Sequence, residues 1–166
     1  MPDAPAVIAV DTNVLLDLVV ADETVLDCFD TIRKRLPKAP ILVPPTVIGE
    51  LADLAKDEDD GPQALAALRQ IRDPWGFQPI NFIPVGHGIV EETARKIRAA
   101  GLIPGEEIND SFVVAEAALV NTTILLSSDA HLREIDHKKL KEILEACEVS
   151  PLIICSPWKI VNQFFS

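Results

Sequence analysis

The stretch V-I-A-V-D-T-N-V-L-L (Val7–Leu16) joins two apolar runs through one acidic residue. The first run, Ala6–Val10, is rich in β-branched residues and has the length of a buried strand. The second run, Val14–Val20, follows Asp-Thr-Asn, residue types that suit the N-terminus of a helix. The stretch therefore predicts a strand, a tight turn and a helix, with Asp11 at the end of the strand.

The rest of the chain repeats this alternation of strand and helix. Further strands are predicted at 41–43, 80–85, 123–127 and 152–155, and helices at 23–36, 46–56, 63–72, 89–100, 106–120, 137–147 and after Pro157. Such alternation favours an α/β fold, in which a mainly parallel sheet of four to five strands lies between two layers of helices. We expect a single domain over residues 1–166, with a surface excursion at 57–79.

Four acidic residues lie at matching places in this predicted fold. Asp11 and Asp129 each follow a strand. Glu50 and Asp110 lie early in helices that start near the same edge of the sheet, where ligands bind in parallel sheets. Carboxylates crowded together resist joint ionisation, so such a group needs bound cations or shared protons. The sequence therefore predicts a carboxylate pocket that holds divalent metal.

Each acid also has a purely structural interpretation. Asp11 and Asp129 suit the N-caps of the helices that follow them. Asp110 suits a helix N-terminus electrostatically, and Glu50 suits a solvated helix face. The prediction of a site therefore depends on the convergence of all four residues.

The chain is acidic, with a net charge of −11 at pH 7. This charge opposes binding to nucleic acid, because affinity for phosphate comes from Lys and Arg. Divalent ions held by the four acids would offset part of the charge and supply the positive charge that a nucleic acid requires. With no Tyr, two Trp and six Phe, an extensive platform for stacking bases is not expected.

The cysteines and the apolar runs indicate in which cellular compartment the protein is located. Cys28, Cys147 and Cys155 are odd in number and form no C-x-x-C pattern, which argues against a disulfide framework and a zinc site. No apolar run approaches the roughly 20 residues that span a bilayer. The first residues lack the basic and apolar regions of a secretory signal. We expect a cytoplasmic protein without a membrane segment.

Four segments carry a resemblance to a known family. They are V-I-A-V-D-T-N-V-L-L, P-P-T-V-I-G-E-L (Pro44–Leu51), I-N-D-S-F-V-V-A-E-A (Ile108–Ala117) and L-L-S-S-D-A-H-L (Leu125–Leu132). In this order, and over almost the whole chain, they resemble the successive motifs of PIN-domain nucleases. The ending S-P-W-K-I-V-N-Q-F (Ser156–Phe164) is similar to the last strand and helix of that family.

The resemblance implies a PIN-like three-layer α/β/α fold and an endoribonuclease that uses Mg²⁺ or Mn²⁺ to hydrolyse RNA phosphodiester bonds. It gives the catalytic and metal-binding roles to Asp11, Glu50, Asp110 and Asp129. Asn13 and Ser127 match positions that support such a site through hydrogen bonds, although both also suit turns and caps.

The resemblance also implies partners. Many members of the family are VapC-type toxins held inactive by a small antitoxin, so an antitoxin and a homodimer are expected. The segment 57–79 makes this chain longer than a minimal toxin.

Oxygen ligands favour Mg²⁺ or Mn²⁺ over zinc. We hypothesise that Asp11 and Asp129 hold the principal metal, while Glu50 and Asp110 complete the site or orient water.

Two other functions compete with a nuclease. One is a catalytically silent PIN-like module that binds RNA or protein. The other is a haloacid-dehalogenase-like phosphatase, which also begins with an aspartate after an apolar strand. That family has a second aspartate two residues later, where this chain has Asn13, and its lysine has no clear counterpart here.

Overall fold

The sheet predicted from the sequence is present and wholly parallel. The computed structural model describes residues 5–81 and 84–164. Within them, a sheet has the strand order β3-β2-β1-β4-β5, and each neighbouring pair is parallel. The strands are β1 (Ile8–Val10), β2 (Ile41–Val43), β3 (Gln78–Pro79), β4 (Ile124–Leu126) and β5 (Ile153–Cys155). The predicted fold class is confirmed.

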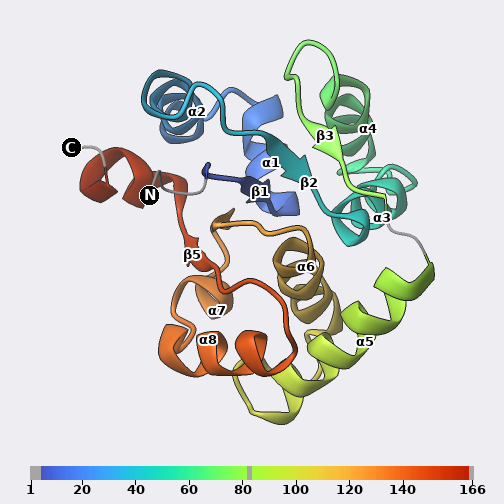
Figure 1. Cartoon of the computed structure of the whole chain (residues 1–166). Coiled ribbons are helices and arrows are strands. Elements are labelled where there is room, and N and C mark those ends of the chain that lie inside the picture. Colours follow the sequence, from blue (N-terminus) through green and yellow to red (C-terminus); the bar gives the residue numbers. More distant parts are fainter. Residues whose placement is uncertain (1–4, 82–83, 165–166) are drawn as a thin grey trace.

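Helices cover both faces of this sheet (Figure 1). They are α1 (Thr12–Val19), α2 (Glu23–Arg35), α3 (Pro45–Leu54), α4 (Gly61–Gln70), α5 (Pro84–Ala99), α6 (Ile108–Leu119), α7 (Ala130–Arg133), α8 (His137–Ala146) and α9 (Pro157–Lys159), which continues as the π-helix η1 (Ile160–Phe164). Right-handed crossovers place α1 to α4 on one face, because β1, β2 and β3 follow one another in one direction. The return from β3 to β4 and β5 places α5 to α8 on the other face.

The predicted position of the third strand was wrong. The strand is Gln78–Pro79 rather than 80–85, and α5 already begins at Pro84. Proline has the φ angle of a first helical turn and lacks the N–H that a strand ladder needs. Residues 82–83 of that prediction lie outside the described residues. The helix predicted at 89–100 therefore begins earlier, and the other elements agree to within about two residues.

The segment 57–79 contributes a helix and an edge strand. α4 packs against α1 and α3, and β3 pairs with β2. Between them, Phe77 is buried, and its ring centroid lies 5.2 Å from that of Phe29 and 5.7 Å from that of Trp75. These aromatic contacts join the segment to the hydrophobic core.

The strand order reverses direction between β1 and β4. Both strands are almost completely buried, and their apolar side chains belong to the main core. The Asp11 N–H donates to the Leu126 carbonyl (2.9 Å), which extends the pairing beyond β1. Ligands of open α/β sheets bind at such a reversal, beyond the carboxyl ends of the strands. Asp11 and Asp129 leave the sheet at this place.

In residues 5–81 and 84–164, no helix is long and apolar enough to cross a bilayer.

Candidate functional site

Asp11 lies at the buried centre of the site and is only 4% exposed. It is the N-cap of α1, where its Oδ1 accepts a hydrogen bond from the Thr12 N–H (2.8 Å). Its Oδ2 accepts hydrogen bonds from Ser127 Oγ (2.8 Å) and Asn13 Nδ2 (3.3 Å). Burial raises the pKa of Asp11, the hydrogen bonds oppose this rise, and the charge of Asp129 adds to it. Asp11 is thus both a helix cap and a desolvated carboxyl group.

The loop after β4 is tied to the start of α1. The completely buried Ser127 accepts the Asp129 N–H at its Oγ (3.1 Å) while it donates to Asp11. Asn13 Oδ1 accepts the Ser128 N–H (3.0 Å). Asp129 is itself the N-cap of α7. Both predicted supporting residues, Asn13 and Ser127, therefore lie between the two strand-end aspartates and hydrogen-bond across them.

Glu50 and Asp110 reach the same place from helices α3 and α6. Glu50 Oε1 accepts a hydrogen bond from Thr12 Oγ1 (3.2 Å). Burial and then the charge of Asp11 raise the pKa of Glu50 to about 7. Burial, Asp11 and Asp129 raise the pKa of Asp110 to about 7 as well. The structure therefore brings all four predicted acids into one electrostatic cluster.

A fifth acid, Glu107, belongs to this cluster and was not predicted. Its charge contributes to the raised pKa of both Glu50 and Asp110. It is the N-cap residue of α6, and its side chain makes no capping hydrogen bond. It precedes Asp110 by three residues, a spacing that places two side chains on one side of a helix. That spacing was the sequence signal for Glu107.

Glu116 fixes the helix that carries Glu50, and it too was not predicted. This buried side chain of α6 accepts hydrogen bonds from the Thr46 N–H (2.9 Å) and Thr46 Oγ1 (2.6 Å). Thr46 lies in the first turn of α3, whose N-cap, Pro44, supplies no side-chain acceptor. Glu116 therefore caps α3 from a distant part of the chain and joins it to the helix of Asp110. Its place in an otherwise apolar stretch of α6 was the only sequence signal.

Replacing Glu116 by alanine is expected to lower the free energy of unfolding by about 1–2 kcal/mol, the usual cost of losing a helix cap. Glu116→Gln should lower the free energy of unfolding by a smaller amount, because the amide oxygen still accepts the Thr46 N–H. Urea denaturation measures both, with the exposed Glu142→Ala of α8 as a matched control. Equal stability of Glu116→Ala and the unmodified chain would show that this contact does not anchor α3.

The donor set of the cluster suits a divalent cation. All five acids offer oxygen, the ligand that Mg²⁺ and Mn²⁺ prefer. Asp110 Oδ2 is buried and has no hydrogen-bond partner within the described residues, which leaves it available to a cation. Within the described residues, however, no group of three or more Asp, Glu, His or Cys side chains is arranged so that it could hold a metal ion. The acids are close enough to interact electrostatically, but they are not arranged as a set of metal ligands.

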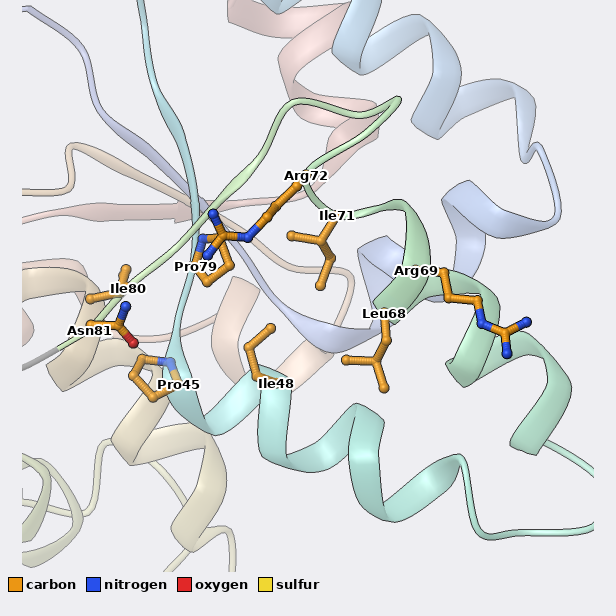
Figure 2. Close-up of a pocket in the computed structure, with 9 residues that line it drawn as sticks. All are labelled: Pro45, Ile48, Leu68, Arg69, Ile71, Arg72, Pro79, Ile80 and Asn81. Atoms are coloured by element: carbon orange, nitrogen blue, oxygen red, sulfur yellow. The ribbon is translucent and has the colours of Figure 1, made fainter.

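A separate hollow of about 400 Å³ lies between α3, α4 and β3 (Figure 2). Pro45 and Ile48 line it from α3, together with Leu68 and the exposed Arg69 of α4. Ile48 and Glu50 are about 200° apart around a helix of 3.6 residues per turn. The hollow therefore lies on the side of α3 opposite Glu50 and does not belong to the acidic cluster.

Comparisons with known proteins agree with this fold. A family model for the PIN domain matches residues 8–138, which confirms the resemblance seen in the sequence. A search of curated proteins found no match. One similar solved structure is VapBC2 from Rickettsia felis, bound to a DNA fragment from their promoter. It has 17% identity and a TM-score of 0.62, with 90% of this chain and 98% of that chain covered.

A second similar structure is FitAcB from Neisseria gonorrhoeae. It has 13% identity and a TM-score of 0.55, and the match covers 91% of this chain and 98% of that chain. At these identities the likeness concerns the fold, and it spans nearly the whole chain.

Proposed function

Because the chain belongs to the PIN domain family, we propose that it is a divalent-metal-dependent endoribonuclease that hydrolyses RNA. The proposed catalytic and metal-binding residues are Asp11, Glu50, Asp110 and Asp129. The observation that carries the proposal is the electrostatic coupling of these acids at the reversal of the strand order. Like charges are brought together there at a cost to stability, and a bound cation removes that cost.

The hydrogen bonds of Asp11 and Asp129 support their proposed role as principal ligands. A carboxylate offers about four acceptor sites, and Asp11 uses three of them for protein donors. One site therefore remains for a cation, in an orientation fixed by Ser127 and Asn13. Ser127 also fixes the backbone of Asp129, so both aspartates are held by one hydroxyl. Asn13 and Ser127 are proposed as positioning residues.

The remaining acids complete the proposed mechanism. A bound Mg²⁺ or Mn²⁺ lowers the pKa of an attacking water and neutralises the phosphate oxygens. Thr12 holds Glu50 by one oxygen, and within the described residues the other oxygen has no hydrogen-bond partner and can orient water. The unpartnered Oδ2 of Asp110 offers a second acceptor. Glu107, at the start of α6, adds negative charge that attracts the cation to this side of the site.

Labelled single-stranded RNA incubated with Mn²⁺, with Mg²⁺ and with chelator tests this proposal. We expect cleavage with either metal and none with chelator. The silent PIN-like module is the second candidate, because the described residues form no closed metal-binding arrangement. RNA binding without metal-dependent cleavage would favour that module over the nuclease.

We also propose a small antitoxin as partner, a homodimer as the state of the isolated chain, and a cytoplasmic location. Support for the antitoxin comes from the family, together with the likeness to VapBC2 and FitAcB. A basic antitoxin segment would suit this acidic chain, and an arginine suits its carboxylates. Light scattering of the chain, purified alone and with the peptide of a neighbouring gene, would measure both assemblies. A monomer without affinity for that peptide would contradict both.

A further inference from the structure

A hollow of about 330 Å³ lies at the same edge of the sheet as the acidic cluster. Ser128, which lies between Ser127 and Asp129, lines this hollow. Ser156 and Trp158, which follow β5, line it as well. The Ser127 N–H donates to the Cys155 carbonyl (3.1 Å), so the end of β5 is held directly against the loop of the site. The hollow is therefore adjacent to the proposed position of the cleaved phosphate.

Trp158 is held at this hollow without being used by the core. The residue is 54% exposed, although large aromatic residues are usually well buried. Ser156 caps α9 through the Lys159 N–H (3.2 Å), and the buried Pro157 fixes the first helical turn. The preceding residues thus pin the backbone of Trp158, while the indole remains open to solvent. An exposed aromatic face beside a phosphate site is suited to stacking a base.

The polar residues of the hollow differ in charge. Arg133 of α7 lines the hollow, and a guanidinium group can bind phosphate in bidentate fashion. Its N–H donates to the Asp129 carbonyl (2.9 Å), so it follows the site by one helical turn. Asp17 of α1 and Asp22, the N-cap of α2, also line the hollow. The Asp22 carboxylate accepts the Val25 N–H (3.1 Å), whereas the Asp17 carboxylate makes no hydrogen bond within the described residues. Burial and the charge of Asp22 raise the pKa of Asp17.

A carboxylate and a phosphate repel each other, so Asp17 does not suit the phosphate of a nucleotide. It suits the N–H groups on the edge of a base, because Asp and Glu accept hydrogen bonds from exocyclic amino groups. The hydroxyls of Ser128 and Ser156 can donate or accept beside it. The hollow thus combines a stacking surface, a phosphate donor and a base-edge acceptor.

We propose that this hollow is a nucleobase subsite of the RNA strand, next to the cleaved bond. The base stacks on Trp158, Arg133 binds its phosphate, and Asp17 accepts an N–H from its exocyclic amino group. The proposal depends on the proposed nuclease function and adds to it a local base preference. Cytosine is bound better than uracil, because its 4-amino group donates where uracil has a carbonyl oxygen. A single stacking residue agrees with a sequence that is poor in aromatic residues.

Fluorescence tests the subsite without any cleavage. The chain has two tryptophans and no tyrosine, so Trp75→Phe leaves Trp158 as the only indole. Cytidine and uridine monophosphate contain no phosphodiester bond that could be cleaved, so Mg²⁺ can be present throughout. We expect saturable quenching of Trp158, with a several-fold lower Kd for the cytidine nucleotide. Free tryptophan amide controls for absorption by the nucleotides. No saturable quenching by either nucleotide would overturn the subsite.

Variants test the named contacts. Asp17→Asn should remove most of the preference for cytidine, and an unchanged preference would overturn the role of Asp17. In cleavage of RNA, Trp158→Ala should raise KM about tenfold with a smaller change in kcat, because it removes one stacked base. Trp158→Phe should restore most of the affinity, which separates stacking from a change in fold. A KM for Trp158→Ala equal to that of the unmodified chain would overturn the stacking role.

The two proposals can fail separately. Quenching by nucleotides in a protein that cleaves no RNA would reject the nuclease and retain the subsite. Cleavage that is indifferent to Trp158 and Asp17 would reject the subsite and retain the nuclease.

Discussion

Asp11→Asn is expected to lower the rate of metal-dependent RNA cleavage at least about a hundredfold, the usual scale for loss of one stabilising group in an active site. Asparagine is close to aspartate in size and keeps an oxygen that can accept the Thr12 N–H, so the cap of α1 survives. It has no negative charge for a cation, and its NH₂ group replaces the acceptor of Ser127 and Asn13. Measurements of kcat and KM at saturating Mn²⁺ test this prediction.

Asp30→Asn is the matched control for that measurement. Asp30 is exposed on α2, and its replacement removes the same charge away from the acidic cluster. We expect its cleavage rate to equal that of the unmodified chain. If Asp11→Asn cleaved RNA at the same rate as Asp30→Asn, Asp11 would not be a metal ligand.

The metal-free protein should lose stability as the pH rises from about 5 to 8. Glu50 and Asp110 titrate near pH 7 when folded, against ordinary values of 4.5 and 3.8. The folded state therefore binds more protons than the unfolded state over this range, and its stability falls as pH rises through 7. The groups are half-buried, so solvent screening reduces the effect to roughly 2 kcal/mol. Urea denaturation at several pH values, with chelator present, measures it.

Saturating Mn²⁺ should reverse this loss, and more strongly at pH 8 than at pH 5. A cation that binds only the folded state stabilises it, by about 2.7 kcal/mol at a hundred times its Kd. Protons compete with the cation for the same carboxylates, so the gain is smaller at low pH. A gain that is independent of pH would show that the metal binds away from these acids.

Asp110→Asn isolates the contribution of the cluster to this pH dependence. The variant cannot ionise at position 110, so its metal-free stability should fall less between pH 5 and 8. His137 acts in the opposite direction in both proteins, because burial and Lys159 lower its pKa and its Nε2 accepts the Ile154 N–H (3.0 Å). Protonation of His137 at acidic pH weakens that contact equally in both proteins. Identical pH slopes in the two proteins would contradict the raised pKa of Asp110.

Local pattern was sufficient for most of the fold. Strand length, β-branched content and helical period depend on near neighbours, and the buried strands β1, β2 and β4 were predicted close to their true bounds. The third strand was misplaced because β3 is short and lies at the sheet edge, where pairing with β2 rather than its own apolar residues defines it. Pro84, a helix start inside the predicted strand, was the neglected local signal.

The candidate site was predicted only in part. Asp11 and Asp129 could be predicted from the sequence because a strand end fixes their position. The ordered motifs added Glu50 and Asp110. Glu107 was missed although its spacing to Asp110 was a local signal. Glu116 was missed because its importance depends on a residue far away in the sequence. Glu116 caps a helix seventy residues before it, a contact that no local pattern contains.

The sequence by itself determined the alternation of strands and helices, the family and the four acids, because these follow from short-range periodicity and ordered motifs. Only the tertiary structure decided the burial, the charges and the hydrogen bonds around those acids. Burial and mutual repulsion raise the pKa values of Asp11, Glu50 and Asp110. Ser127 holds both Asp11 and Asp129, and the end of β5 places Trp158 beside them. Desolvation and charge interaction depend on distances in space, so they appear only when the strand ends meet.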